Sequence, residues 1–384
     1  MGTLPVVVLG SGLAGYAVAR EFRRLDKETP LVVISRDHAG FYSKPMLSNA
    51  LTAKKTAQSL VMKPAEKMAA ELNATVRARS GVRLIDTAAQ TIALDDGETL
   101  PYRDLVLALG DDPIRLPLEG DAAGSVLSVN DLDDYARFAD RLEGAKTVAI
   151  LGAGLIGCEF ANDLLAHGMA PVVIDLADRP LARLLPAAAS ERLRVRLEAA
   201  GVQFRFDVAA SRIDHVGQRL RLTLSDGSAI DADLVLSAIG LRPRTAVAQQ
   251  AGVAVHRGVV TNRWLATSAP HVYAVGDCAE VEGHTLPFVL PLMQQSRALA
   301  ATLAGTPTPV VYPAMPVTVK TPACPTVVCP PPLDAPGSWN TELSDDGCTA
   351  LFHGPDGALL GFAVLGSAVA QKQNLAARVA GLLP

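Results

Sequence analysis

A strong charge of either sign is absent from this sequence. The 384 residues include 35 Lys and Arg and 39 Asp and Glu, which gives a formal net charge of −4 at pH 7. Without an excess of positive charge, no broad electrostatic field is available to hold a phosphate backbone. We therefore expect no nucleic-acid partner.

Long hydrophobic runs are also absent. No uninterrupted apolar stretch reaches the roughly 18 residues that a membrane-spanning helix needs. The first apolar run, Val6–Leu9, ends at Gly10 before it reaches the length of a secretion-signal core, and Val6 stands where a myristoylation signal requires Ser or Thr. These absences predict a soluble, cytoplasmic protein with no membrane association.

Cysteine is scarce, and no metal or hydrolase motif is present. The five cysteines are odd in number and include no C-x-x-C, which disfavours a disulfide framework or a zinc ribbon. Cys324 and Cys329 have the spacing of a redox pair in some disulfide reductases, but they lie in a proline-rich segment far from any nucleotide motif, which favours ordinary buried thiols. The seven histidines show no metal-ligand spacing, and no serine stands in G-x-S-x-G, so we expect no metal site and no serine hydrolase.

What the sequence does contain is a duplicated pattern of strand, glycine turn, helix and strand. The apolar run Val6–Leu9 leads into GSGLAG at 10–15, and Val148–Leu151 leads into GAGLIG at 152–157. Further on, each copy has an Asp-Gly hairpin turn and then a buried strand that ends on glycine. The repeated order predicts an α/β fold with two Rossmann-like dinucleotide-binding domains.

The glycines of each turn have distinct expected roles. Gly10 and Gly152 permit the tight turn, and Gly12 and Gly154 let a pyrophosphate approach the backbone N–H groups at the helix N-terminus. The third glycine of each motif allows helix and strand to pack closely. One such motif is weak evidence, whereas two in the required context strongly favour dinucleotide binding over a merely structural turn.

Acidic residues at the ends of the second strands are candidates for binding ribose. Asp175 follows the run Val172–Ile174, and no arginine comes directly after it, so a 2′-phosphate would meet a carboxylate there. This favours NADH over NADPH, although an ordinary strand-end aspartate would leave the preference open. Asp37 is the corresponding candidate in the first unit.

A third motif, TSAPHVYAVGDCA at 267–279, follows the two glycine turns. In this order the three motifs resemble the FAD-dependent pyridine nucleotide-disulfide reductase superfamily, in which the Gly-Asp carboxylate binds the ribitol of FAD. The resemblance implies an FAD-binding domain in two parts with an NADH-binding domain inserted between them, and a small C-terminal α+β interface domain. The expected boundaries are 1–112 and 241–312 for FAD, 113–240 for NADH and 313–384 for the last domain.

The segment Phe41–Asn49 distinguishes the branches of this superfamily. It contains no cysteine, which argues against disulfide reductase chemistry and against a cysteine-based peroxidase or oxidase, and it is similar to the ferredoxin-reductase-like branch. The tryptophan-containing C-terminal motif of ferredoxin reductases is replaced by MPVTVKTPACP at 315–325. Together with KPMLS, GLIGCEFANDL, GLRPRT and YAVGDCAE, this stretch resembles the rubredoxin reductases of bacterial alkane-oxidation systems.

The resemblance implies an NADH:rubredoxin oxidoreductase with FAD and NADH as cofactors and rubredoxin as the one-electron acceptor. NADH donates two electrons as a hydride, the rubredoxin iron accepts one, and FAD can mediate between them. The resemblance also implies a pathway in which the reduced rubredoxin supplies an alkane hydroxylase. We expect a monomer. The alternatives are a flavorubredoxin or ferredoxin reductase and, in a different class, an NADH-sensing flavoprotein of the apoptosis-inducing-factor type.

The resemblance also implies the site residues. Glu159 is expected beside the nicotinamide, paired with a lysine near flavin N5. Asn49 occupies the usual lysine position, so Lys44 and Lys320 are the candidate replacements, each with a solvated surface lysine as the alternative. The implied FAD contacts are Gly10, Gly12, Leu13, Ala14, Gly15, Asp37, Lys44, Pro45, Ala108, Gly110, Gly276, Asp277 and Met293, and the implied NADH contacts are Gly152, Gly154, Leu155, Ile156, Gly157, Glu159, Asp175 and Gly240.

Overall fold

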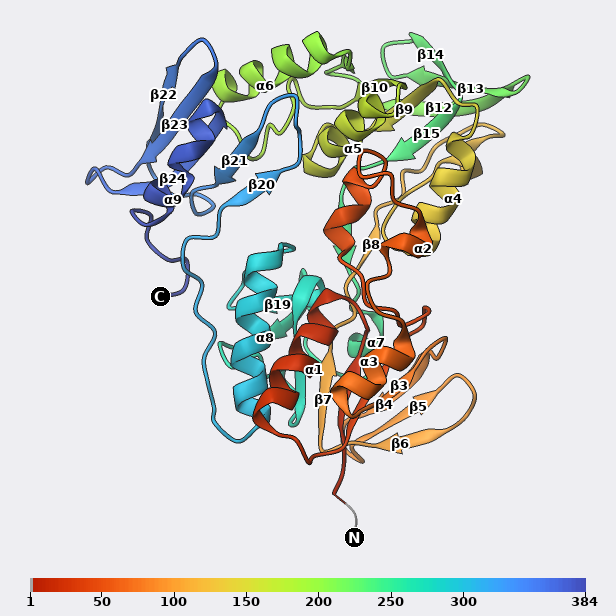
Figure 1. Cartoon of the computed structure of the whole chain (residues 1–384), viewed down its shortest axis with the longest axis vertical. Coiled ribbons are helices and arrows are strands. Elements are labelled where there is room, and N and C mark those ends of the chain that lie inside the picture. Colours follow the sequence, from red (N-terminus) through yellow and green to blue (C-terminus); the bar gives the residue numbers. More distant parts are fainter. Residues whose placement is uncertain (1–2) are drawn as a thin grey trace.

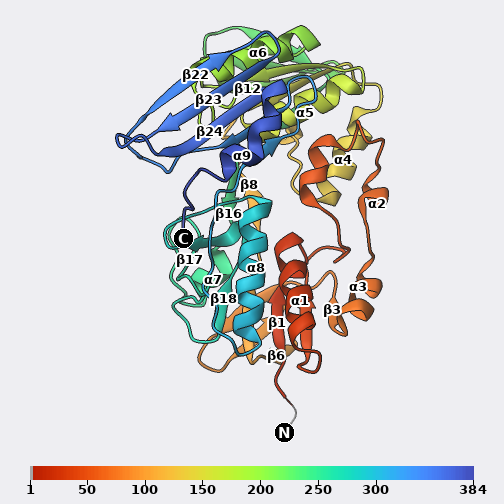
Figure 2. The same ribbon diagram turned by 60° about the vertical axis from the view of Figure 1, so that its left-hand side comes forward.

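The first parallel sheet is built from the apolar runs of the N-terminal half and one later strand. The computed structural model, which describes residues 3–384, places helix α1 (Leu13–Leu25) directly after the first strand, with helix α8 (Val289–Leu303) side by side with it (Figures 1 and 2). All strand pairs in this sheet are parallel. In spatial order the strands are β18 (Val272–Ala274), β7 (Asp104–Leu107), β1 (Val6–Leu9), β2 (Leu31–Ile34) and β3 (Thr75–Arg77).

A second parallel sheet repeats this design. Its central strand β9 (Thr147–Leu151) leads through the second glycine turn into helix α5 (Leu155–Ala166). In spatial order the strands are β11 (Gln203–Arg205), β10 (Ala170–Ile174), β9 and β15 (Leu234–Ser237), all parallel. Helices α4 (Leu132–Leu142) and α6 (Ala187–Ala200) belong to the same half of the molecule (Figure 1). The direction in which the chain adds strands reverses at β1 in the first sheet and at β9 in the second. Doubly wound sheets bind their ligands at this point of reversal.

Each parallel sheet carries a three-stranded antiparallel extension. The tight turns lie where the sequence predicts them. Gly97 and Gly227 adopt positive φ angles of 90° and 83°, a conformation that residues with a side chain rarely adopt. Both Asp-Gly hairpins are therefore confirmed. The extensions consist of β4 (Val82–Asp86), β5 (Thr91–Leu94) and β6 (Thr99–Pro101) in the first unit, and of β12 (Ala210–Val216), β13 (Arg219–Leu224) and β14 (Ala229–Ala232) in the second.

A two-stranded connection joins the two halves. Strand β8 (Asp111–Pro113) leaves the first sheet and pairs antiparallel with β16 (Leu241–Pro243), which returns from the second. The remaining elements of the first half are α2 (Ala57–Leu60), α3 (Ala65–Leu72), α7 (Ala246–Gln250), β17 (Val259–Thr261) and β19 (Ala279–Val281).

The C-terminal residues form a separate antiparallel sheet beside α6 (Figure 1). A hairpin turns at Gly357, whose φ is +80°, as the Pro-Asp-Gly sequence predicts. In spatial order the strands are β20 (Val317–Val319), β21 (Thr326–Cys329), β24 (Leu359–Gly366), β23 (Gly347–His353) and β22 (Ser338–Leu343), followed in the chain by α9 (Lys372–Ala376).

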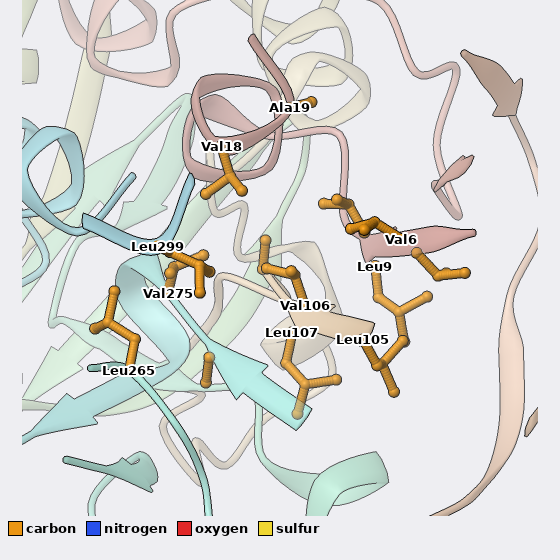
Figure 3. Close-up of a cluster of buried hydrophobic side chains, with 14 of the residues drawn as sticks. Val6, Leu9, Val18, Ala19, Leu105, Val106, Leu107, Leu265, Val275 and Leu299 are labelled. Atoms are coloured by element: carbon orange, nitrogen blue, oxygen red, sulfur yellow. The ribbon is translucent and has the colours of Figure 1, made fainter. Parts of the chain in front are cut away.

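Two large cores hold these domains together. One fills the first half, where Val6, Val106 and Leu299 come from strands and helices far apart in the chain (Figure 3). The other is continuous from the second sheet into the C-terminal sheet, and it also takes in Leu47 and Leu60 from the first half. The segment that follows β2 is therefore packed against the second nucleotide domain, although its place in the sequence assigns it to the first.

This architecture confirms the predicted fold class of two Rossmann-like domains and a small C-terminal α+β domain. The domain boundaries themselves stay a prediction. Within residues 3–384, no helix is both long enough and apolar enough to cross a membrane.

Candidate dinucleotide and electron-transfer site

One continuous cavity connects the carboxyl ends of the two parallel sheets with the C-terminal domain. Its volume is about 1710 Å³, larger than the ~300–1,000 Å³ of a typical single-ligand pocket. Both glycine turns line the cavity, and so do residues 315–318 and Lys320 at the start of the C-terminal sheet. The space therefore suits more than one large ligand.

The first glycine turn has the shape that a pyrophosphate requires. A Cβ atom at Gly10 would lie 2.1 Å from the Ala108 carbonyl oxygen, and one at Gly15 would lie 1.9 Å from the Gly10 carbonyl oxygen. A Cβ atom at Gly12 would meet nothing within 4 Å, because Gly12 is the N-cap of α1 and faces open space. The N-terminus of α1 is thus accessible to an anion.

The second turn repeats this geometry. A Cβ atom at Gly152 would lie 2.6 Å from the Ala238 carbonyl oxygen, and one at Gly157 would lie 1.9 Å from the Gly152 carbonyl oxygen. Gly154 is the N-cap of α5, and again nothing lies within 4 Å of its Cβ position. The glycine roles expected from the sequence therefore have a steric basis in both units.

The two strand-end aspartates line the cavity, and each is already hydrogen-bonded. Asp37 Oδ1 accepts hydrogen bonds from Ser35 Oγ at 2.6 Å and from the Ala39 N–H at 2.8 Å. The Asp175 carboxylate accepts from the backbone N–H groups of Ala153 and Ala177. These bonds fix each carboxylate beside its glycine turn. Sequence reasoning considered only the residues directly after Asp175 and therefore missed Arg179 and Arg183, which line the same cavity.

The loop that carries Asp277 is held by a buried network. The Gly276 N–H donates to Gln295 Oε1 at 2.6 Å, and Gln295 Nε2 donates to the Tyr312 hydroxyl at 2.7 Å. Gly276 packs against α1, since a Cβ atom there would lie 2.7 Å from the Cβ of Ala14. Asp277 therefore enters the cavity next to the first phosphate-binding turn.

Lys44 lies between two carboxylates. Its ammonium nitrogen is 2.5 Å from Asp111 Oδ1 and 3.8 Å from Asp277 Oδ2. Asp111 is only 2% exposed, and sequence reasoning missed it because nothing in its local pattern signals a site. Burial raises the pKa of Asp277 to about 6; the Lys44 ammonium opposes this shift and the Asp111 carboxylate adds to it.

Glu159 lies at the junction of all three domains. It is fully buried on α5, and its carboxylate accepts hydrogen bonds from Ser48 Oγ at 2.5 Å and from the Lys320 backbone N–H at 2.9 Å. The Lys320 ammonium forms an ion pair with the same carboxylate. Of the two candidate lysines, the structure therefore brings Lys320 to Glu159 and directs Lys44 to Asp111.

Most of the predicted contacts line the cavity, and four do not. Gly15, Gly157 and Gly276 serve close packing instead. Met293 is not on the wall, whereas Leu292 is. The first intrahelical hydrogen bond of α8 runs from the Leu292 N–H to the Phe288 carbonyl. The N–H groups that a ligand could use at the start of this helix therefore lie before Met293. The residues of the predicted set that do line the cavity are Gly10, Gly12, Leu13, Ala14, Asp37, Lys44, Pro45, Ala108, Gly110, Gly152, Gly154, Leu155, Ile156, Glu159, Asp175, Gly240, Asp277 and Lys320.

None of the five cysteines lines the cavity. All five are free and buried. Burial raises the thiol pKa of both Cys324 and Cys329, which disfavours the reactive thiolate.

Comparison with known proteins identifies the family to which this geometry belongs. Residues 4–301 match the pyridine nucleotide-disulphide oxidoreductase family, and residues 309–379 match a rubredoxin binding C-terminal domain. The chain is 50% identical to rubredoxin-NAD(+) reductase of Alcanivorax borkumensis, over 99% of this chain and 100% of that one. It is 46% identical to the Acinetobacter baylyi protein of the same name, over 97% and 96%. The structure of a ferredoxin reductase from Rhodopseudomonas palustris superposes with a TM-score of 0.88 at 27% identity, over 98% of this chain and 95% of that one.

Proposed function

The chain belongs to the pyridine nucleotide-disulphide oxidoreductase family, and on this premise we propose that it is an FAD-dependent NADH:rubredoxin oxidoreductase. The observation that carries the proposal is the single cavity in which two dinucleotide turns meet the domain that matches a rubredoxin-binding family. A fold shared with other reductases would not identify the acceptor, whereas this C-terminal domain does.

The residues present fit two dinucleotides. Gly12 and Gly154 leave open space at the N-termini of α1 and α5, and a buried acceptor, Asp111 Oδ2, has no hydrogen-bond partner among residues 3–384. The first turn and Asp277 would hold FAD, and the second turn and Asp175 would hold NADH. The turns supply free N–H groups and a positive helix end to each pyrophosphate.

The acceptor sets the chemistry that the cofactors must supply. A rubredoxin iron takes one electron, whereas NADH gives up two as a hydride. FAD held in this site would supply the conversion of a two-electron hydride donor into single electrons. The protein fixes positions: Glu159 and Lys320 form a rigid ion pair where the two dinucleotide sites and the rubredoxin-binding domain converge. A cytoplasmic location and an electron supply to an alkane hydroxylase are parts of this proposal.

The purified protein is expected to be yellow, with one FAD per chain, and anaerobic NADH is expected to bleach it without added thiol. With NADH in excess, a rubredoxin should be reduced faster than a ferredoxin at equal concentration, because the C-terminal domain is of the rubredoxin-binding type. A folded, colourless protein with no affinity for FAD would contradict the proposal. Faster reduction of ferredoxin would agree with a flavin-dependent NADH oxidoreductase but would show that ferredoxin, not rubredoxin, is the preferred acceptor.

Asp175 is expected to set the preference for NADH. Its carboxylate, held by the Ala153 and Ala177 N–H groups, would repel a 2′-phosphate. Asp175→Asn removes this charge at nearly constant size, so the ratio of kcat/KM for NADH to that for NADPH should fall about tenfold or more. Asp231→Asn is the matched control, because Asp231 pairs with Arg221 on the antiparallel extension and neither residue lines the cavity. A wild-type enzyme that prefers NADPH would refute this role.

A further inference from the structure

The wall of the FAD part of the cavity contains one more carboxylate than the predicted site accounts for. Asp111 begins β8, is 2% exposed and lines the cavity together with Asp277 and Lys44. Its Oδ1 accepts from Lys44 Nζ at 2.5 Å, but its buried Oδ2 has no hydrogen-bond partner within the described residues. A buried carboxylate oxygen without a partner is costly, which points to a group that is bound there.

The charges around Asp111 do not balance. Within residues 3–384, Lys44 forms ion pairs with both Asp111 and Asp277, so two carboxylates share one directly contacting ammonium. Arg244 is also near, but its guanidinium is engaged by Asp112 Oδ1 at 2.7 Å and by the Leu109 carbonyl at 2.8 Å. Two carboxylates that share one site cannot both ionise freely, and one proton relieves the repulsion.

We propose that Asp111 is a flavin-positioning residue, which shares one proton with Asp277 so that the pair, with Lys44 as its counter-ion, holds the polyol chain of FAD. This inference rests on the proposed function. A carboxylate accepts a hydrogen bond from a hydroxyl, whereas a protonated carboxyl donates one, and a polyol needs partners of both kinds. Asn130 supports the same assignment, because it is 6% exposed, lines the cavity and has a buried Oδ1 without a partner in the described part of the chain.

The shared proton makes flavin binding depend on pH. Burial raises the pKa of Asp277 to about 6; Lys44 and Arg244 oppose this shift, and Asp111 adds to it. Binding of FAD removes water from the pair, which disfavours the doubly charged form further. Below about pH 6 the proton is already present in the free protein, and above it the proton must be taken up on binding. The affinity for FAD therefore falls as the pH rises.

The test measures the FAD dissociation constant of the apoprotein from pH 5.5 to 8.5 by quenching of flavin fluorescence. For the wild type the constant should rise about tenfold across this range, which corresponds to a shift of about one pKa unit on binding. Asp111→Asn leaves one carboxylate beside Lys44 but does not change the burial of Asp277, so the rise of its dissociation constant with pH should be clearly smaller than in the wild type. Asp133→Asn, a partly exposed carboxylate on α4 that pairs with Arg79 and does not line the cavity, should keep the wild-type dependence.

Asp277→Asn is the second variant, and it should also flatten the pH dependence, because it too leaves a single carboxyl group. This variant keeps the inference testable if Asp111→Asn does not fold. A wild-type pH dependence in either folded variant would overturn the shared proton while leaving the oxidoreductase intact. A wild-type chain that binds no FAD at any pH would instead end the proposed function.

Discussion

A valine at position 154 is expected to weaken reduction by NADH severely while leaving FAD in place. Gly154 has a φ of −72°, which valine tolerates, and its Cβ position faces open space, so the fold should accept the side chain. The isopropyl group would occupy the space through which the NADH pyrophosphate reaches the N-terminus of α5. Displacing a substrate by about 1 Å can cost 10²-fold, so the KM for NADH should rise at least about 100-fold.

Stopped-flow bleaching of the flavin by NADH measures this effect, and dithionite, which needs no nucleotide site, should still reduce the Gly154→Val protein fully. Gly12→Val is the mirror-image control, which should lose FAD and keep its fold. Gly157→Ala should behave differently, since its Cβ would lie 1.9 Å from the Gly152 carbonyl oxygen and destabilise the protein itself. Wild-type bleaching of Gly154→Val by NADH would show that the nucleotide binds elsewhere.

These glycines illustrate what the sequence could predict. The turn, the open N-cap and the close helix packing each depend on residues within a few positions of one another, so the local pattern G-x-G-x-x-G carries the geometry. The Asp-Gly hairpins and the Pro-Asp-Gly turn were predictable for the same reason, because positive φ angles select glycine. Because the same strand–turn–helix–strand pattern occurs twice, the local prediction of one nucleotide-binding unit became a prediction of two such domains.

Other parts of the site depend on contacts that no local pattern carries. Lys320 lies 161 positions from Glu159 and comes from a different domain, so only the resemblance suggested that a lysine would meet this glutamate. Asp111 lies 67 positions from Lys44 and has no motif of its own. The Met293 contact was implied by the resemblance alone and stays a prediction, although its neighbour Leu292 is the residue that lines the cavity. Such pairings follow from how the domains pack, not from spacing.

The Lys320 pairing leads to the second large expected effect, a loss of stability in Lys320→Met. The Glu159 carboxylate is fully buried, and Lys320 supplies its positive partner. Methionine keeps most of the aliphatic chain but removes the ammonium, so an uncompensated charge would remain inside the protein. Breaking a buried ion pair from one side typically costs ~3–5 kcal/mol. The urea midpoint followed by circular dichroism should fall accordingly, whereas Lys67→Met, at an exposed position of α3, should leave it unchanged.

The double variant Lys320→Met/Glu159→Gln separates stability from function. A glutamine at 159 carries no charge, its oxygen can still accept from the residue 320 N–H, and its amide can donate to Ser48 Oγ, so most of the lost stability should return. Flavin bleaching by NADH should nevertheless stay slow, because the Glu159–Lys320 ion pair at the junction of the two dinucleotide sites is not restored. Because the two residues are in direct contact, their effects should be strongly non-additive in a double-mutant cycle. Full recovery of both the stability and the bleaching rate would show that the Glu159–Lys320 pair is only a structural link between the NADH and C-terminal domains. Additive losses would show that the two residues do not act as a pair.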